Sequence, residues 1–365
     1  MHAWRLDELE WGCREMMEHV PKPLYDGRAT VYLDQNVLTM ALKERDPDFF
    51  RRLVSGFQVV YSDDTLREIK RSGQPEKFLQ VLCDLSAMHF KYDLDASFNL
   101  TGRVLICTLS PRQAYDNYLT IEPVYDALLA SANQSTLKMY GGRKDSSFED
   151  ISSEQVDAFQ RLMDHLSAQM DELADSHPEV AAAIDKQIET LQEQYNAVSV
   201  LSAQEMAKHI DEANEVSAIS RYREAVGAGP KQLNNIEAPN VIQKIWAMYQ
   251  DLEGYKGMGD SIEDFLGISV NPVYGREMHQ HEKVTGIYNV LNVIGYKPDN
   301  RLDREHRHIA AISDAAHAAI ASHAQLLLSA DTAFVGKVRA IYEYLQIPTE
   351  VGLVSSGDDP IVVSG

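Results

Sequence analysis

The stretch Thr30-Val31-Tyr32-Leu33-Asp34 decides the fold of this chain: a short apolar run that ends in a carboxylate. A run of β-branched and aliphatic residues bounded by polar ones is typical of a buried parallel strand. Two more segments have the same form, since Val59-Val60-Tyr61 leads towards Glu68 and Leu326-Leu327-Leu328 leads to Asp331. We therefore predict an α/β protein with acids gathered at one edge of its sheet.

The position of these acids indicates a ligand site. Open α/β sheets bind their ligands just beyond the carboxyl ends of parallel strands. Carboxylate oxygens without a nearby thiol or paired imidazole suit hard cations, so the pattern predicts a site for Mg²⁺ or Mn²⁺.

The two ends of the chain alternate between strands and helices. We predict strands at 30–34 and 57–62, helices at 37–54, 64–71 and 75–87, and a hairpin with arms at 87–94 and 103–109. Near the carboxyl end we predict helices at 303–323 and 334–345, strands at 325–329 and 349–354, and a tail at 357–360. These two regions, 29–111 and 301–356, are expected to form one sheet.

The segment 112–300 carries few strand signals and is expected to be a helical insertion, broken at its glycines and prolines. Residues 179–226 contain no Gly or Pro and keep an apolar stripe, which predicts a long helix that folds back on 152–176. Its role is either a packing arm or a surface for a protein partner or a second copy. Residues 1–28 are expected to hold an amphipathic amino-terminal helix.

Composition limits the class of protein. Three cysteines without CxxC spacing and the lack of a long apolar stretch predict a soluble, cytoplasmic protein without a membrane segment. The net charge is −21, and residues 111–300 carry most of it, with 30 Asp/Glu against 15 Lys/Arg. The acidic charge weakens a nucleic-acid hypothesis without excluding it, because the flanking segments are near balance.

Four segments together resemble a PIN domain. Tyr32-Leu33-Asp34-Gln35-Asn36 resembles the first strand of that family, and Tyr61 to Ile69 resembles its second strand and the acidic helix position after it. Ser313-Asp314 and the later Leu326-Leu327-Leu328-Ser329-Ala330-Asp331 resemble the carboxy-terminal half. The resemblance covers about 29–110 and 301–354, and it implies a three-layer α/β/α fold with a central parallel sheet.

By this resemblance, Asp34, Glu68, Asp314 and Asp331 are the expected catalytic residues and the ligands of one or two Mg²⁺ or Mn²⁺ ions. Such ions activate water and stabilise charge on a scissile phosphate. The implied activity is a metal-dependent nuclease, with RNA as the preferred substrate over DNA. Toxins and antiphage-defence effectors use this scaffold, which makes cleavage of self or phage RNA a hypothesis.

Several polar residues near the four acids are candidates for substrate binding. Asn36, with Ser329, is placed to hydrogen-bond the carboxylates. Arg67 and Arg71 flank Glu68, while Arg304 and Arg307 share a helical stripe with Asp314, so all four are candidates for phosphate contacts. His317 lies one turn after Asp314 and either lines the site or is a buried hydrogen-bonded histidine.

Other interpretations stay open. Asp34 and Asp331 each precede a helix and are possible N-caps, and Thr65 with Glu68 forms a possible capping box. Arg301 and His306 fit the loose Arg-x₄-His pattern of HEPN ribonucleases, which cut RNA without metal. A catalytically inactive PIN-like scaffold whose acidic insertion binds a partner is a further alternative. A phosphatase is disfavoured because the segment after the first strand reads Asp34-Gln35-Asn36 instead of Asp-x-Asp.

Overall fold

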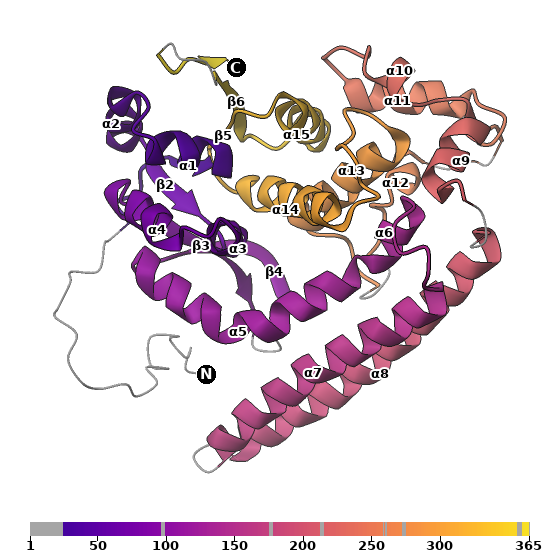
Figure 1. The fold of residues 1–365 in the computed structure, drawn as a ribbon, viewed down its shortest axis with the longest axis horizontal. Helices are drawn as coiled ribbons and strands as arrows, with labels where there is room; N and C mark the ends of the chain where they lie inside the picture. The colour runs from indigo at the N-terminus through magenta and orange to yellow at the C-terminus, as the bar shows by residue number, and fades with distance from the viewer. Residues whose placement is uncertain are drawn as a thin grey trace.

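Seven strands form one mixed sheet in the order β4-β3-β2-β1-β5-β6-β7 (Figure 1). The computed structural model describes residues 25–95, 99–174, 178–211, 215–257, 259, 261–271, 275–355 and 360–364. The predicted amino-terminal helix at 1–20 and most of the tail at 357–360 lie outside these residues. The strands are β1 (Thr30–Leu33), β2 (Gln58–Tyr61), β3 (Met88–Leu94), β4 (Leu100–Cys107), β5 (Leu326–Ser329), β6 (Glu350–Val354) and β7 (Val363–Ser364).

The two ends of the chain meet in this sheet, as predicted. β1 is central and pairs in parallel with β2 on one side and with β5, almost 300 residues later, on the other. β3 and β6 continue the parallel set outward. The sheet is mixed because β4 and β7 are antiparallel edge strands, and β7 was not predicted.

The first face of the sheet is covered by helices from the amino-terminal part of the chain. These are α1 (Gln35–Leu42), α2 (Pro47–Gly56), α3 (Asp63–Arg71), α4 (Pro75–Asp84) and the start of α5 (Pro111–Ala132). Val31 and Leu33 point into this core from β1, while Tyr32 points to the opposite face, as the two-residue period of a strand requires. Burial on both faces explains why the β1 sequence is continuously apolar.

The second face is covered by α13 (Gln280–Ile294), α14 (Glu305–Ala321) and α15 (Thr332–Leu345), with α11 (Val241–Gln250) packed in the same core (Figure 1). The short helices α9 (Ala218–Val226), α10 (Pro230–Leu233) and α12 (Ile262–Phe265) lie in the chain on either side of α11. Apolar residues of α11 and α13 share this core with Tyr32 and Val60 of the sheet. The later part of the predicted insertion thus covers the sheet.

The earlier part of the predicted insertion forms a helical hairpin. After α6 (Gln134–Met139), helix α7 (Phe148–Ala174) runs antiparallel to α8 (Pro178–His209) along one side of the molecule (Figure 1). The Phe159 and Tyr195 rings stack across the pair with centroids 4.1 Å apart. The predicted fold-back of the long helix onto 152–176 is therefore confirmed.

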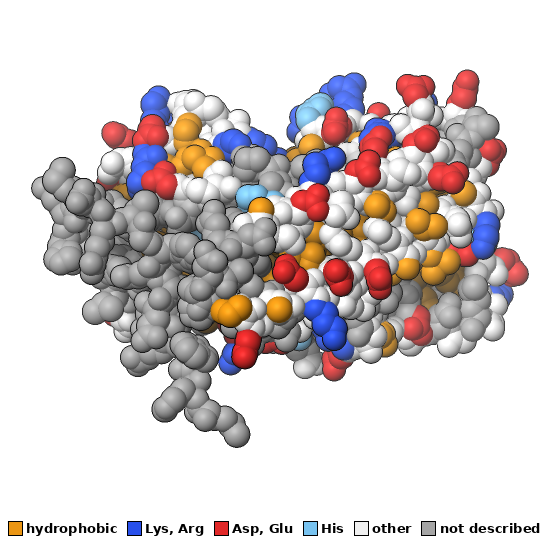
Figure 2. Space-filling model, turned by 90° about the horizontal axis from the view of Figure 1, so that it is seen from below, with side chains coloured by type: hydrophobic (Ala, Val, Ile, Leu, Met, Phe, Trp, Pro, Cys, Tyr) orange, Lys and Arg blue, Asp and Glu red, His pale blue; other side chains and the backbone are white. Residues whose placement is uncertain are grey.

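The outer surface of this hairpin mixes charged and apolar side chains. Figure 2 views the molecule from below and shows acidic side chains spread over this face among hydrophobic ones. On α8, Val198, Val200 and Leu201 are exposed. No helix in the described part of the chain has the length and apolar character needed to cross a membrane.

Two predicted helices are interrupted. The helix predicted at 37–54 is wrong as a single element, because α1 ends at Leu42 and α2 begins at Pro47. Proline has no N–H to continue a helical ladder, and Asp46 adopts a left-handed φ of 45° and caps α2 through Phe49 N. The apolar stripe predicted over 179–226 is likewise divided between α8 and α9, with Ser217 as the N-cap of α9.

Candidate metal and phosphate site

The sheet brings the predicted acids to one edge. Because β1, β2 and β5 are parallel, their carboxyl ends meet at the same edge, where Asp34 follows β1 and Asp331 follows β5. Glu68 lies on α3, the helix that follows β2, and Asp314 lies in the middle of α14, the helix that leads into β5. Residues separated by up to about 300 positions therefore contribute to one region.

Asp34 is held firmly and is 8% exposed. Its Oδ1 accepts a hydrogen bond from Gln35 N as the N-cap of α1, and its Oδ2 accepts from Ser329 Oγ at 2.6 Å. Asn36 Nδ2 donates to the same Oδ2 at 2.5 Å, and Asn36 Oδ1 accepts from Ala330 N. The predicted contacts of Asn36 and Ser329 with the carboxylate are confirmed, and they join the end of β1 to the end of β5.

Burial raises the pKa of Asp34, and the nearby Glu68 charge adds to this, while His317 and the Ser329 hydrogen bond act in the opposite direction. A carboxylate held in this way keeps its position. A bound cation would stabilise its charged form, because the cation offsets the hydration lost on burial.

Glu68 is placed by α14. Its Oε1 accepts a hydrogen bond from Ser313 Oγ at 3.0 Å, and Arg71 Nη2 lies 3.9 Å from the same oxygen. Its Oε2 lies 3.2 Å from His317 Nε2, an ion-pair distance without the alignment of a hydrogen bond. Burial opposes ionisation of Glu68, but His317 and Ser313 outweigh it and lower the pKa of the carboxyl group.

His317 is buried, with 1% of its surface exposed. Its Nδ1 shares a hydrogen bond of 2.6 Å with the hydroxyl group of Tyr32, which also lies 2.7 Å from Ser62 Oγ. Burial disfavours the charged ring, but Tyr32 and Glu68 outweigh this and raise the pKa of His317 well above its usual value. Of the two alternatives in the sequence, the structure therefore has the buried, hydrogen-bonded histidine, which contacts Glu68 and also lowers the pKa of Asp34.

Asp314 differs from the other acids because it has no protein partner. Its carboxylate makes no hydrogen bond or ion pair with any residue in the described ranges. Burial raises the pKa of Asp314 well above its usual value, and the charges of Asp34 and Asp299 raise it further. A partly buried carboxylate beside a second carboxylate is costly unless a cation is added.

Asp331 caps α15. Its Oδ1 accepts hydrogen bonds from Ala333 N at 2.8 Å and Phe334 N at 2.9 Å, and the residue is exposed. The N-cap interpretation left open by the sequence is thus correct for one oxygen of this carboxylate. Its backbone N–H also donates to Ser329 Oγ, which ties Asp331 to the hydroxyl that holds Asp34.

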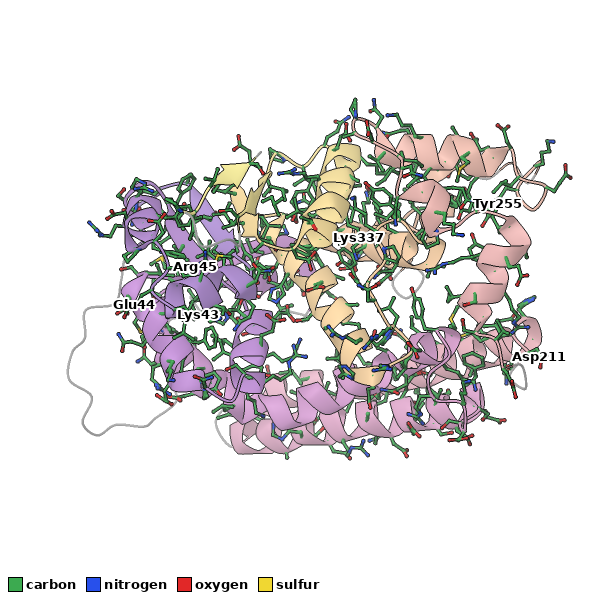
Figure 3. All side chains as sticks on the ribbon, turned by 45° about the horizontal axis from the view of Figure 1, so that its top comes forward. Lys43, Glu44, Arg45, Asp211, Tyr255 and Lys337 are labelled. Atoms are coloured by element: carbon green, nitrogen blue, oxygen red, sulfur yellow. The ribbon has the colours of Figure 1, made fainter. Side chains whose placement is uncertain are left out.

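A buried charged pair next to the acids was not predicted. Lys337 on α15 is 0% exposed, and its ammonium donates to Asp299 Oδ1 at 2.7 Å and to Asn292 Oδ1 at 3.0 Å. The ammonium also lies 3.9 Å from the centroid of the Tyr288 ring. Figure 3 labels Lys337 on α15. Lysine in an amphipathic helix usually reaches solvent, so this contact has no local signature in the sequence.

The four arginines proposed for phosphate binding have different surroundings. Arg67 forms a mostly buried ion pair with Asp64 at 2.6 Å, which engages its guanidinium within α3. Arg71 is exposed and lies beside Glu68. Arg304 and Arg307 are exposed at the start of α14, and neither guanidinium group makes a hydrogen bond or ion pair with a residue the structure describes.

No protein-family model, no curated protein and no solved structure matches this chain. The resemblance to a PIN domain therefore stays a prediction from the sequence.

The metal-ligand prediction meets a geometric limit. Within the residues described, no three Asp, Glu, His or Cys side chains are close enough together to enclose a metal ion. Mg²⁺ keeps several of its waters and is commonly held through one or two carboxylates and a substrate phosphate. Asp34 and Asp314, whose charges raise each other's cost of ionisation, fit such an open site, so a complete protein cage is not required.

Asp314→Asn is expected to raise the unfolding temperature at pH 7 in the absence of divalent cations. A carboxyl group whose pKa is raised in the folded protein opposes folding once the pH exceeds its unfolded value of about 3.9. The gain should therefore shrink as the pH falls towards 4 and disappear below about pH 3, where the carboxyl group is protonated in both states. Thermal unfolding monitored by circular dichroism measures this, with the exposed Asp116→Asn as the control. A loss of stability in Asp314→Asn at pH 7 would show that this carboxylate has a structural partner.

Proposed function

We propose that this protein is a divalent-cation-dependent phosphodiesterase that acts on nucleic acid, with RNA as the preferred substrate. The observation that carries the proposal is the pair Asp34 and Asp314: one carboxylate is fixed by three donors, and the other makes no hydrogen bond or ion pair with any described residue. Structural acids are normally paired or hydrogen-bonded. An unpaired acid beside a fixed one is a typical arrangement of a functional site.

Asp34 and Asp314 are the residues that would hold the cation, with Asp331 beside them at the same edge. Mg²⁺ or Mn²⁺, when bound, supplies a Lewis acid that activates water and offsets charge on the phosphate. The chain's own contribution is positioning. Ser329 and Asn36 fix Asp34, while Ser313 and His317 keep Glu68 ionised and oriented.

Positive side chains near the acids support a phosphate substrate. Arg71 lies beside Glu68, and Arg307 lies two turns before Asp314 on α14. Arginine commonly contacts phosphate oxygens in nucleic-acid complexes. The metal-independent HEPN alternative is less well supported, because Arg301 and His306 are exposed before and at the start of α14, in a protein built on a seven-stranded sheet rather than an all-helical fold.

Incubation of the purified protein with a mixed pool of RNA and DNA oligonucleotides tests this proposal. Cleavage of RNA is expected with Mn²⁺ or Mg²⁺, and none is expected with EDTA. Cleavage that persists in EDTA would favour an Arg301/His306 site. If neither nucleic acid is cut with either metal, the phosphodiesterase proposal is rejected, and the helical hairpin of α7 and α8 becomes the region to test for a protein partner.

A further inference from the structure

A groove of about 700 Å³ borders the acid site. Its walls come from α1 along its length, the second half of α3, the start of α4 and one residue of α14. Gln35, which directly follows Asp34, and Glu68 both line it. The groove therefore extends from the acids along the helices that cover the first face of the sheet.

Three cationic side chains line this groove: Lys43, Arg71 and Lys77. Glu68 is the single acid among the lining residues within the described part of the chain. Lys43 lies just after α1, on the amino-terminal part of the molecule (Figure 3). The groove is thus locally positive in a protein whose net charge is −21.

Neither lysine is neutralised by an acid in the part of the chain that the structure describes. The Lys43 side chain is exposed, and its ammonium makes no hydrogen bond or ion pair with any described residue. Lys77 donates to the neutral side-chain oxygen of Gln74 at 2.9 Å. Arg71 donates to Ser313 Oγ at 3.3 Å. Its distance of 3.9 Å from Glu68 is long for an ion pair.

Several other cations among the described residues are paired with acids. Examples are Arg143 with Glu154, Arg276 with Glu282 and Lys283 with Glu277, each at 2.7 Å. Lys43 and Lys77 pair with no acid among the described residues, and together with Arg71 they concentrate positive potential in one groove. Concave regions lined by one sign of charge focus the field and attract ligands of the opposite charge.

We propose that this groove binds the sugar-phosphate backbone of a single-stranded RNA segment next to the phosphate that is cut. This inference rests on the proposed function and names the substrate form that the site accepts. Polar side chains between the cations (Thr39, Ser72 and Gln74) can contact sugar and phosphate oxygens. The volume is that of a small-ligand pocket, whereas a duplex presents a major groove of about 12 Å and needs a wider surface.

The double variant Lys43→Gln/Lys77→Gln tests the groove. Fluorescence anisotropy in EDTA, where no cleavage is expected, measures binding of labelled oligo(U) and of its duplex with oligo(A). We expect the variant to bind oligo(U) roughly tenfold more weakly than wild type, and its plot of log affinity against log salt to lose about 1.4 in slope, since each phosphate contact on a single strand contributes about 0.7. The duplex should bind more weakly than oligo(U) to wild type.

Lys231→Gln/Lys244→Gln is the matched control, because it removes the same charge from exposed lysines on α10 and α11, away from the groove (Figure 1). Equal losses of oligo(U) affinity in the two double variants, or no loss in Lys43→Gln/Lys77→Gln, would contradict the proposal that RNA binds in this groove. Duplex binding as tight as that of oligo(U) would overturn the single-strand assignment. A different result would contradict the proposed function. If the wild-type protein binds oligo(U) through this groove but cuts no nucleic acid with Mn²⁺, the cleavage proposal is rejected and the assignment of RNA binding to the groove is retained.

Discussion

Asp34→Asn is expected to lower the rate of Mn²⁺-dependent RNA cleavage by at least about a hundredfold, because changes to residues that merely support metal ligands already cost about 10- to 100-fold. The fold should be retained, since asparagine is as good an N-cap as aspartate. The remaining carbonyl oxygen can accept from Gln35 N or from Ser329 Oγ, so the join between β1 and β5 is largely preserved.

The rate should be measured at saturating Mn²⁺ with an unstructured RNA, and circular dichroism should confirm folding. Asp84→Asn is the control, because this exposed carboxylate on α4 accepts only from Gln80. Equal rates for wild type and Asp34→Asn would remove this residue from the site. A loss that is restored by raising the Mn²⁺ concentration would indicate weakened cation binding, which agrees with the proposed role.

Asp299→Ala is expected to cost about 3–5 kcal/mol in the free energy of unfolding, because it leaves a buried cation without its counter-charge. Lys337 is 0% exposed, and its other contacts are the neutral oxygen of Asn292 and the ring of Tyr288. Burial already lowers the pKa of Lys337 in spite of Asp299, so loss of the carboxylate removes its main compensation.

Urea unfolding at pH 7 measures this cost. The double variant Asp299→Ala/Lys337→Met should regain a large part of it, because a buried pair can often be replaced by apolar residues of similar volume. Asp48→Ala, which breaks the exposed pair with Arg51, should cost at most about 1 kcal/mol. A cost for Asp299→Ala no larger than that of Asp48→Ala would show that Lys337 reaches water.

The parallel strands were predictable from the sequence because buried parallel strands have a local signature. Val31 to Leu33 and Leu326 to Leu328 are apolar throughout, and the structure pairs them in register. The break at Asp46-Pro47 was missed because the apolar period continues across it, although Pro47 at a helix start is a local signal that could have located it.

The site was predictable to the extent that strand ends determine it. Asp34 and Asp331 follow strands and Glu68 comes after β2, whereas Asp314 was expected from the resemblance to a PIN domain. The contacts of Tyr32 with His317 and of Asp299 with Lys337 were not predictable, because a core tyrosine and a helix lysine have the same local pattern whether or not they meet a charged partner. The groove cations Lys43 and Lys77 were missed for the same reason, since each belongs to an ordinary exposed helix end.

The central place of β1 has a consequence for synthesis on the ribosome. β1 pairs with β2 soon after both emerge, but its second neighbour, β5, is translated almost 300 residues later. During that interval β1 is an open edge, which exposes unpaired backbone groups and favours contact with other chains. Insertion of β5 both closes this edge and brings α14 with Asp314 to Asp34. A nascent chain therefore cannot assemble the acid pair until α14 and β5 have been made, so any cleavage activity would be withheld until that late step of synthesis.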